Sequence, residues 1–236
     1  MLTAYQTATA NLLQNPAAPT TLYATTDLTT YINSARSQLA GDGMCIRALA
    51  TFAITGASKH YAFSVASGLA ASIAGILHLR MINMSGRTFP LNGWSWEYFQ
   101  QYFLLDTTIA TPTDWAQYGQ GVTGSIYVNP MPDASYTLTA DAVCYPIPLV
   151  NDSTTEAIPY PWTDAVPYFA AYLALMSAQT NARIADALRM LELYNEFKDR
   201  ARRYSTPDVL PYQYEQSSKT PPVPAAGTKL AAAGGA

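Results

Sequence analysis

Charged residues are scarce in this chain. Only 12% of its 236 residues are charged, which is about half the share usual for a soluble domain. The formal net charge is −3, so no global basic field favours nucleic acid as a partner. Tyrosine and proline, with 17 and 16 copies, stand beside a 49% hydrophobic content that can fill a sizeable core. A chain with so few charges is expected to have a largely neutral surface. A neutral surface suits a subunit that stays in contact with other subunits, although compositional bias of the genome would also produce it.

Cysteine and histidine are nearly absent. Cys45 and Cys144 lie far apart in β-like surroundings, which predicts two buried free thiols and disfavours a disulfide framework. His60 and His78 sit beside or within strand-like runs and have no partnered base in the sequence. No ligand spacing typical of a metal site is present, so we expect no metal and no cofactor.

Long apolar runs are also missing. The first residues, MLTAYQTATANLL, lack the basic start and apolar block of a signal peptide. The most apolar window, Ala62–Ile82, is interrupted by Ser and Gly and contains His78 and Arg80, so it is a poor membrane span. We therefore expect a soluble protein, made in the cytoplasm, with no membrane contact.

The chain lacks the common catalytic motifs. It has no Gly-Lys-Ser/Thr phosphate loop, no His-Glu-x-x-His and no Gly-x-Ser-x-Gly. The glycines of 119–124 precede a strand and not a helix, which favours a tight turn over a phosphate site. The carboxylates are scattered, with no spacing that supports a glycosidase pair: Asp106, Asp114, Asp133, Asp141 and Asp152. We expect no catalytic residues.

Periodicity predicts a helix first. Apolar residues from Leu28 to Leu39 recur at three- and four-residue steps, with Thr26 or Asp27 as the N-cap and Gly41 as the stop. Residues 1–21, with their prolines and weak periodicity, predict an extended arm. Beyond Pro161 two more helices are expected, one from a Thr163 or Asp164 cap to about Ser177 and one over Arg183–Tyr204. In the last helix, the apolar side is expected to hold Ile184, Leu188, Leu191, Tyr194 and Ala201.

The middle of the chain is rich in β patterns. Strands are predicted at Ala48–Thr55, His60–Val65, within Ser72–Met84 and at Thr88–Leu91, with Thr111–Tyr118 as a loop. Two further runs, Ser125–Val128 and Tyr136–Tyr145, flank a turn over Asn129–Asp133 and predict a hairpin. In the second run Tyr136, Leu138, Ala140, Ala142 and Cys144 form the more apolar face.

These patterns together predict an α+β fold. We expect an N-terminal arm at 1–21, a small helical bundle from 22–43 and 159–205, an inserted β-rich sandwich or barrel-like unit at 44–158, and an extended C-terminal tail at 206–236. The tail is interrupted by prolines and ends in GTKLAAAGGA, a composition typical of segments that order only when bound.

Two side-chain groups are candidates for function. A short helix is expected from a Ser95 cap. Trp94, Trp96, Tyr98 and Tyr102 form an aromatic cluster there that could stack sugars or bases, but helical spacing favours a core role. The late helix holds six basic residues that could form a solvated face, a seam between subunits or a lining that faces DNA. They are Arg183, Arg189, Lys198, Arg200, Arg202 and Arg203.

The order of elements and several motifs resemble head-to-tail connector adaptor proteins of tailed bacteriophages, most closely those of short-tailed phages. The motifs are Tyr-Val-Asn-Pro-Met-Pro at 127–132, Tyr-Thr-Leu at 136–138, Tyr-Pro-Ile-Pro-Leu at 145–149, Ile-Pro at 158–159, Trp162, and Ala-Val-Pro at 165–167. The resemblance covers about residues 22–205.

The resemblance implies a structural virion protein of the neck, made in the host cytoplasm, with no catalysis. Such adaptors form a homo-oligomeric ring, commonly of about twelve copies. The ring docks on the portal, extends the DNA channel with non-specific DNA contact, and meets the tail or nozzle protein. The terminal segments of the family reach neighbours, which makes these residues candidates for latching: Tyr204, Pro207, Leu210, Pro211, Tyr212 and Tyr214.

Other readings of the sequence stay open. The chain could be a stopper or a minor tail protein, which residue patterns do not separate from an adaptor. A carbohydrate-active tail enzyme would need a cleft with paired carboxylates near Trp94 and Trp96. A free nucleic-acid-binding protein is disfavoured by the net charge of −3.

Overall fold

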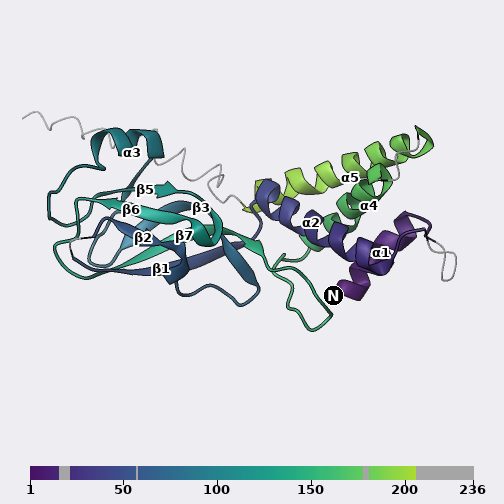
Figure 1. Cartoon of the computed structure of the whole chain (residues 1–236), viewed down its shortest axis with the longest axis horizontal. Coiled ribbons are helices and arrows are strands. Elements are labelled where there is room, and N and C mark those ends of the chain that lie inside the picture. Colours follow the sequence, from purple (N-terminus) through teal and green to yellow (C-terminus); the bar gives the residue numbers. More distant parts are fainter. Residues whose placement is uncertain (16–21, 57, 178–180, 206–236) are drawn as a thin grey trace, which may run out of the picture. The chain divides into compact units, whose positions relative to one another are not determined.

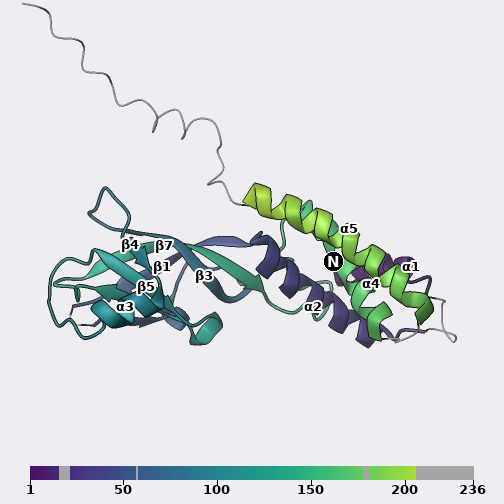
Figure 2. The same ribbon diagram turned by 90° about the horizontal axis from the view of Figure 1, so that it is seen from above.

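Helices and two β-sheets build the folded part of the chain, which confirms the predicted α+β class. The computed structural model describes residues 1–15, 22–56, 58–177 and 181–205 (Figure 1). In both ribbon views α1, α2, α4 and α5 lie together, and α3 lies with the strands (Figures 1 and 2). The α-helices are α1 (Leu2–Leu12), α2 (Thr25–Gly43), α3 (Trp96–Tyr102), α4 (Val166–Ser177) and α5 (Asn181–Ser205).

Helix α1 replaces most of the extended arm predicted for residues 1–21. Leu2, Tyr5 and Thr9 recur at three- and four-residue steps and are buried, and Leu13 continues the same face. The helix packs on α4 and α2. The prediction of an arm is wrong for residues 2–12 because the apolar stripe is narrow, and tertiary packing rather than propensity makes so short a helix stable.

Helix α2 has different ends from those predicted. Its N-cap is Ala24, which makes no side-chain cap bond, so neither Thr26 nor Asp27 is the cap. The helix continues past Gly41 to Gly43 and ends with Met44 in the left-handed region at φ 50°. The buried face extends through Leu39 and Ala40 to Gly43, and this burial carries the helix beyond the expected stop.

Small side chains allow α2, α4 and α5 to pack closely. Ala35, Ala170, Ala174 and Ala187 are fully buried at these contacts. The two late helices are confirmed, although the 3-10 turn Trp162–Ala165 leads into α4. The N-cap of this 3-10 turn is Pro161, with no side-chain cap bond, and Thr163 and Asp164 lie inside the turn, so the predicted cap is wrong.

The buried face of α5 differs in part from the predicted one. Tyr194 and Ala201 are buried as expected, but Ile184 and Leu188 are exposed. Ala187 is buried in their place, because α4 and α2 meet the helix on the side that Ala187, Tyr194 and Ala201 share. An exposed Ile–Leu pair one turn apart is therefore left on the outside of α5.

Seven strands form two sheets in the described part of the chain. One sheet has the order β1-β7-β3 and is antiparallel; the other has the order β2-β6-β5-β4, with β4 parallel to β5. The strands are β1 (Arg47–Ile54), β2 (His60–Ala62), β3 (Ile73–Met84), β4 (Asn92–Trp94), β5 (Asp114–Tyr118), β6 (Ser125–Asn129) and β7 (Tyr136–Pro146).

The predicted hairpin is wrong, although both of its strands exist. β6 pairs with β2 and β5, whereas β7 pairs with β1 and β3, so each is a central strand of a different sheet. Both edges of each strand are already hydrogen-bonded to other partners. The segment between them, with Pro130 and Pro132, therefore crosses from one sheet to the other. The apolar face predicted for β7 is confirmed, since Leu138, Ala140 and Ala142 are buried.

Two smaller predictions in the same region are also wrong. Residues 111–118 are not all loop, because β5 occupies Asp114–Tyr118 with a strand on either side. The strand predicted at Thr88–Leu91 is absent, and β4 follows it at Asn92–Trp94. Leu91 makes one backbone bond of 2.8 Å to the carbonyl of Ile82 before the chain turns towards β5.

One glutamine links the two sheets. Gln117 of β5 accepts a bond of 2.8 Å from the backbone N–H of Leu79 and donates one of 2.9 Å to the carbonyl of Leu77. The side chain thus satisfies backbone groups along β3, which is an edge strand and would otherwise present them to another chain.

Candidate interaction surfaces

The six basic residues of α5 do not gather into one cationic patch. Helical spacing places Arg189, Arg200 and Arg203 on one face, and all three are exposed. Glu192 and Glu196 lie on the same face, and Arg200 is 3.9 Å from Glu196. The face is therefore mixed in charge, and its ion pair is a surface pair worth a few tenths of a kcal/mol at most (about 0.3–0.5).

Arg183 has a structural contact at the start of α5. Its Nη1 donates a bond of 2.8 Å to the hydroxyl of Tyr23, and the guanidinium lies 6.0 Å from the centre of the Tyr23 ring. Tyr23 is buried and precedes α2. This arginine therefore ties α5 to the segment that leads into α2.

The remaining basic residues of the predicted set lie near the end of α5. Lys198 donates to the Asn195 side chain at 2.9 Å and is half-buried. Arg202 and Arg203 are exposed in the last turn, where positive charge is favourable beside the helix C-terminus. Tyr204 is exposed and stacks on Trp162 with 6.0 Å between ring centres. The other latching candidates, Pro207, Leu210, Pro211, Tyr212 and Tyr214, lie outside the described residues.

A pocket of about 470 Å³ opens where α1 ends beside α4 and α5. Arg183, Asp186 and Arg189 give it a charged side, and leucine, methionine and tyrosine give it an apolar one. Sequence reasoning missed it because one wall comes from the end of α1 and the others from α4 and α5, more than 150 residues later in the chain. Its lining is Leu12, Leu13, Gln14, Tyr168, Leu175, Arg183, Asp186, Arg189, Met190 and Leu193.

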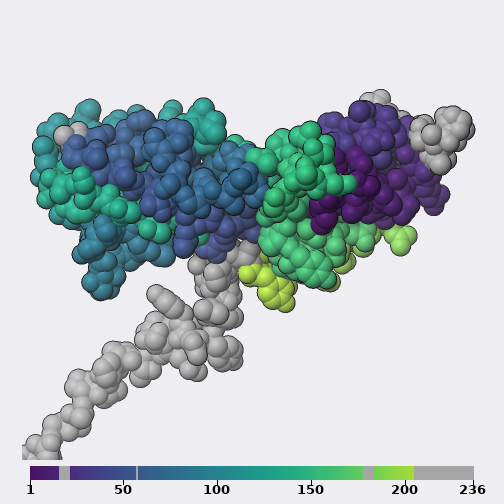
Figure 3. Space-filling model, turned by 90° about the horizontal axis from the view of Figure 1, so that it is seen from below, coloured from purple at the N-terminus to yellow at the C-terminus, as the bar shows by residue number. Residues whose placement is uncertain are grey.

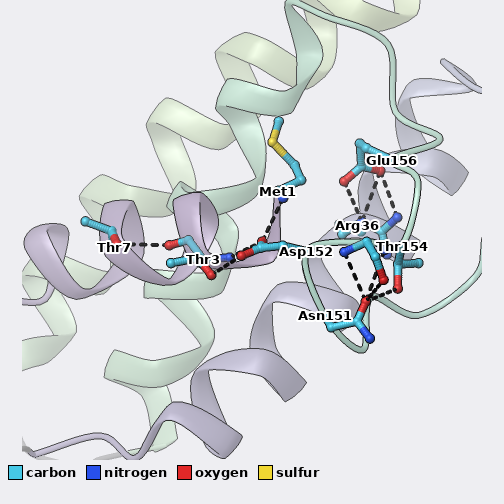
Figure 4. A network of polar contacts seen from close by, with 9 residues as sticks. Met1, Thr3, Thr7, Arg36, Asn151, Asp152, Thr154 and Glu156 are labelled. Atoms are coloured by element: carbon cyan, nitrogen blue, oxygen red, sulfur yellow. Dashed lines mark hydrogen bonds and ion pairs between the residues drawn. The ribbon is translucent and has the colours of Figure 1, made fainter.

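A buried ion pair joins α2 to the segment that follows β7 (Figure 4). Arg36 is 1% exposed, and its Nε and Nη2 contact both oxygens of Glu156, at distances down to 2.7 Å. Its Nη1 donates to the carbonyl of Ile147 at 2.8 Å, and Glu156 also accepts from the backbone of Ala157 and Ile158. Every charged atom of the pair therefore has a partner, which is the condition for tolerating buried charge.

Two neighbours complete this junction. Asn33 pairs with the backbone of Leu149 in both directions, at 2.8 and 3.0 Å. Burial, with the nearby negative charge of Glu156, raises the pKa of Tyr5 well above its ordinary value. The phenol of α1 is thus held neutral beside the ion pair.

Asp152 holds the beginning of α1. Its carboxylate accepts from the amine of Met1 at 2.7 Å and from the backbone and hydroxyl of Thr3 (Figure 4). These bonds, the one from the Met1 ammonium first, hold the pKa of Asp152 well below its usual range. The space-filling view shows the segment after β7 against α1 on this face (Figure 3).

The scattered carboxylates have structural partners. Asp114 accepts from Asn92, Thr113 and Trp94, the last at 2.7 Å. Asp106 accepts from Thr108, Asp133 from Tyr136, and Asp141 from Arg47. The Asp114 carboxylate near Trp94 is therefore an acceptor fixed by three donors, which is a poor arrangement for a glycosidase acid or nucleophile.

Histidine, cysteine and glycine also have structural surroundings. His60 is exposed and lies 5.0 Å from the Tyr127 ring, and burial, with the charge of Arg80, lowers the pKa of His78. Both cysteines are buried free thiols, as predicted. The glycine-rich run is a turn between β5 and β6, also as predicted, with Gly119 and Gly121 at positive φ.

Neither a metal cluster nor a membrane span is found in the part of the chain that the structure describes. No group of three or more His, Cys, Asp or Glu side chains there could hold a metal ion. No helix within the same residues is both long and apolar enough to cross a membrane.

The core role that helical spacing favoured for the aromatic residues around α3 is wrong for three of the four; the fourth, Trp96, is half-buried against the rings of Tyr118 and Tyr127. Ser95 does cap this helix, accepting from the backbone of Tyr98. Only Phe99 on the helix is buried, whereas Trp94, Tyr98 and Tyr102 are exposed. The helix covers β5 with a single side, so the rings of Trp94, Tyr98 and Tyr102 stay exposed.

Comparison with known protein families assigns the chain to one of them. None of the curated proteins compared with the chain matches it. The family model described as SU10 adaptor protein matches residues 2–211, which include α1, both sheets and the two late helices. This is a family of structural phage adaptor proteins, components of the virion, and not an enzyme family. The chain therefore belongs to the SU10 adaptor protein family.

Proposed function

We propose that the chain is a subunit of a head-to-tail adaptor ring that docks on the phage portal, extends the DNA channel and connects to the tail. The observation that carries the proposal is the family match over residues 2–211. The match spans the helices and the inserted strands together, so it supports the whole architecture and not one generic module.

In this proposal the parts of the chain have different tasks. The helical bundle of 22–43 and 159–205 meets the portal, and the β-rich unit of 44–158 faces the tail side or the outside. The outer face of α5, with Arg189, Arg200 and Arg203 exposed, is the candidate for contact with neighbours or with DNA. Its interleaved glutamates favour a polar seam between subunits over a purely cationic lining.

Ring formation requires a head-to-tail contact between copies. Two exposed features of α5 support such a contact: the apolar pair Ile184 and Leu188, and Tyr204 at the last turn. The C-terminal tail, with Leu210, Tyr212 and Tyr214, is the segment that we assign to latching onto a neighbour or the portal.

The experiment is reconstitution of the full chain with the portal protein of the same phage, followed by native mass spectrometry and negative-stain imaging. We expect a closed ring of copies on the portal. Replacing Tyr212 and Tyr214 by alanine is expected to weaken retention on the portal, whereas Tyr160→Ala, an exposed tyrosine outside the tail, is not. A chain that stays monomeric and never joins the portal contradicts the proposal.

A further inference from the structure

An exposed row of aromatic rings runs along one side of α3. Trp94, Tyr98 and Tyr102 are 40%, 40% and 58% exposed. The rings of Trp94 and Tyr98 stack with 4.6 Å between centres and 19° between planes, and the Tyr98 and Tyr102 centres are also 4.6 Å apart. We call these three residues the aromatic row.

The aromatic row is fixed from below. Phe99 is fully buried under α3 and contacts the rings of Phe103 and Tyr127 at 5.5 and 6.3 Å. Lys59 bonds to the backbone carbonyl of Phe103 and, at 2.8 Å, to the side chain of Asn129 on β6. The rings of the row are thus held in place before binding, so binding of a partner loses little side-chain entropy there.

The charge around the aromatic row is negative. Residues 94–114, which carry the row, hold three acidic side chains, Glu97, Asp106 and Asp114, and no lysine or arginine. Glu97 is exposed on α3, and the carboxylate of Asp114 lies beside the Trp94 indole, 2.7 Å from its Nε1. The ammonium of Lys59 is occupied by the carbonyl of Phe103, just after α3, and by the side chain of Asn129.

We propose that the aromatic row binds a protein partner through arginine or lysine side chains, which lie over the rings while Glu97 supplies the opposite charge. Guanidinium groups stack on Trp and Tyr faces, and removal from water strengthens this attraction. Trp and Tyr are also the residues that most often dominate protein interfaces. The row would bind such a partner whether or not the chain joins a portal.

The test uses the full chain and three defined probes: a hexa-arginine peptide, a hexa-glutamate peptide and maltohexaose. Calorimetry is expected to detect binding of hexa-arginine only. Tyr98→Ala is expected to weaken it about tenfold, whereas Tyr98→Phe, which keeps the ring, binds as the parent does. Tyr160→Ala serves as the control for loss of an exposed tyrosine elsewhere.

Circular dichroism of each variant separates loss of binding from loss of fold, and Glu97→Gln provides a second, conservative variant. We expect Glu97→Gln to weaken hexa-arginine binding a few-fold, about threefold, and to reduce its salt dependence. Absence of hexa-arginine binding, equal binding by Tyr98→Ala, or binding of maltohexaose at the row overturns the proposal. Self-association that Tyr98→Ala abolishes also overturns it, because the occupant is then a second copy.

Discussion

Arg36 and Glu156 place two charges out of water at the junction between α2 and the segment after β7. The arginine contacts the glutamate, the Asn33 side chain and the carbonyl of Ile147. In a buried pair of this kind the attraction offsets the cost of removing both ions from water, so the net gain from the intact pair is small. Removal of one partner destabilises the fold strongly, because the other ion stays buried without its opposite charge.

Arg36→Met is therefore expected to lower the free energy of unfolding by about 3–5 kcal/mol. Chemical denaturation measures this loss. The matched control is Arg200→Met, which removes an arginine whose carboxylate partner is 3.9 Å away at the surface, and which is expected to cost less than about 0.5 kcal/mol. Equal losses in the two variants would show that the Arg36 charge is not buried.

The two cysteines give a second residue-scale prediction. Burial raises the pKa of Cys45 and of Cys144 to about 11, so both thiols stay protonated at pH 8 in the folded chain. A thiol in the unfolded chain ionises near its ordinary pKa of about 8.5. Above that pH ionisation stabilises the unfolded chain, so the two thiols stabilise the fold fully below about pH 8.5 and progressively less as the pH rises towards about 11.

We expect a thiol reagent at pH 8 to label neither cysteine in the native chain and both after denaturation. Absorbance of the released reagent measures the labelling. Labelling of one cysteine at the unfolded rate under native conditions would mean that its site opens to solvent.

At the scale of elements, alanines set the spacing of the helices. Ala174 of α4 is fully buried in the bundle. Ala174→Leu adds volume to a close-packed contact and is expected to cost about 1–3 kcal/mol, measured by thermal or chemical unfolding. Ala185→Leu makes the same change at an exposed position of α5 and is expected to be nearly neutral. Similar stability of the two variants would contradict close packing of α4.

Local sequence patterns predicted the helices and strands better than they predicted which of these elements pack or pair with one another. The period of two in β7, the Ser95 cap of α3 and the last helix were all readable because the signal lies within a few residues. The pairing of β6 and β7 was not, because turn residues between two strands indicate a hairpin equally well when the strands belong to different sheets. Helix α1 was missed because its stability comes from α4 and α2, far away in sequence.

The candidate surfaces were predicted less well than the fold, for the same reason. The basic residues of α5 could be named from the sequence, but only the structure shows that Arg183 contacts Tyr23. The Arg36–Glu156 pair joins residues 120 positions apart, so no spacing rule could find it. Exposure of the aromatic row depends on how much of α3 the second sheet covers.

At the scale of the whole molecule, polar bonds connect the helices to the strands in the described residues, and the chain has little charge to keep copies apart. The junction at Arg36 and Glu156 and the bonds of Asp152 to α1 tie the helices to the strand-bearing part of the chain. A net charge of −3 on 236 residues gives weak repulsion between copies. Both properties suit a subunit that is packed against its own kind.

The most direct test of the adaptor role is a cryo-electron microscopy map of the assembled phage neck. We predict that this chain forms a closed ring between portal and tail, with α1, α2, α4 and α5 on the portal side and the two sheets on the tail side or the outside. A map in which the chain is absent from the neck, or occurs there as isolated copies without a ring, would contradict the account.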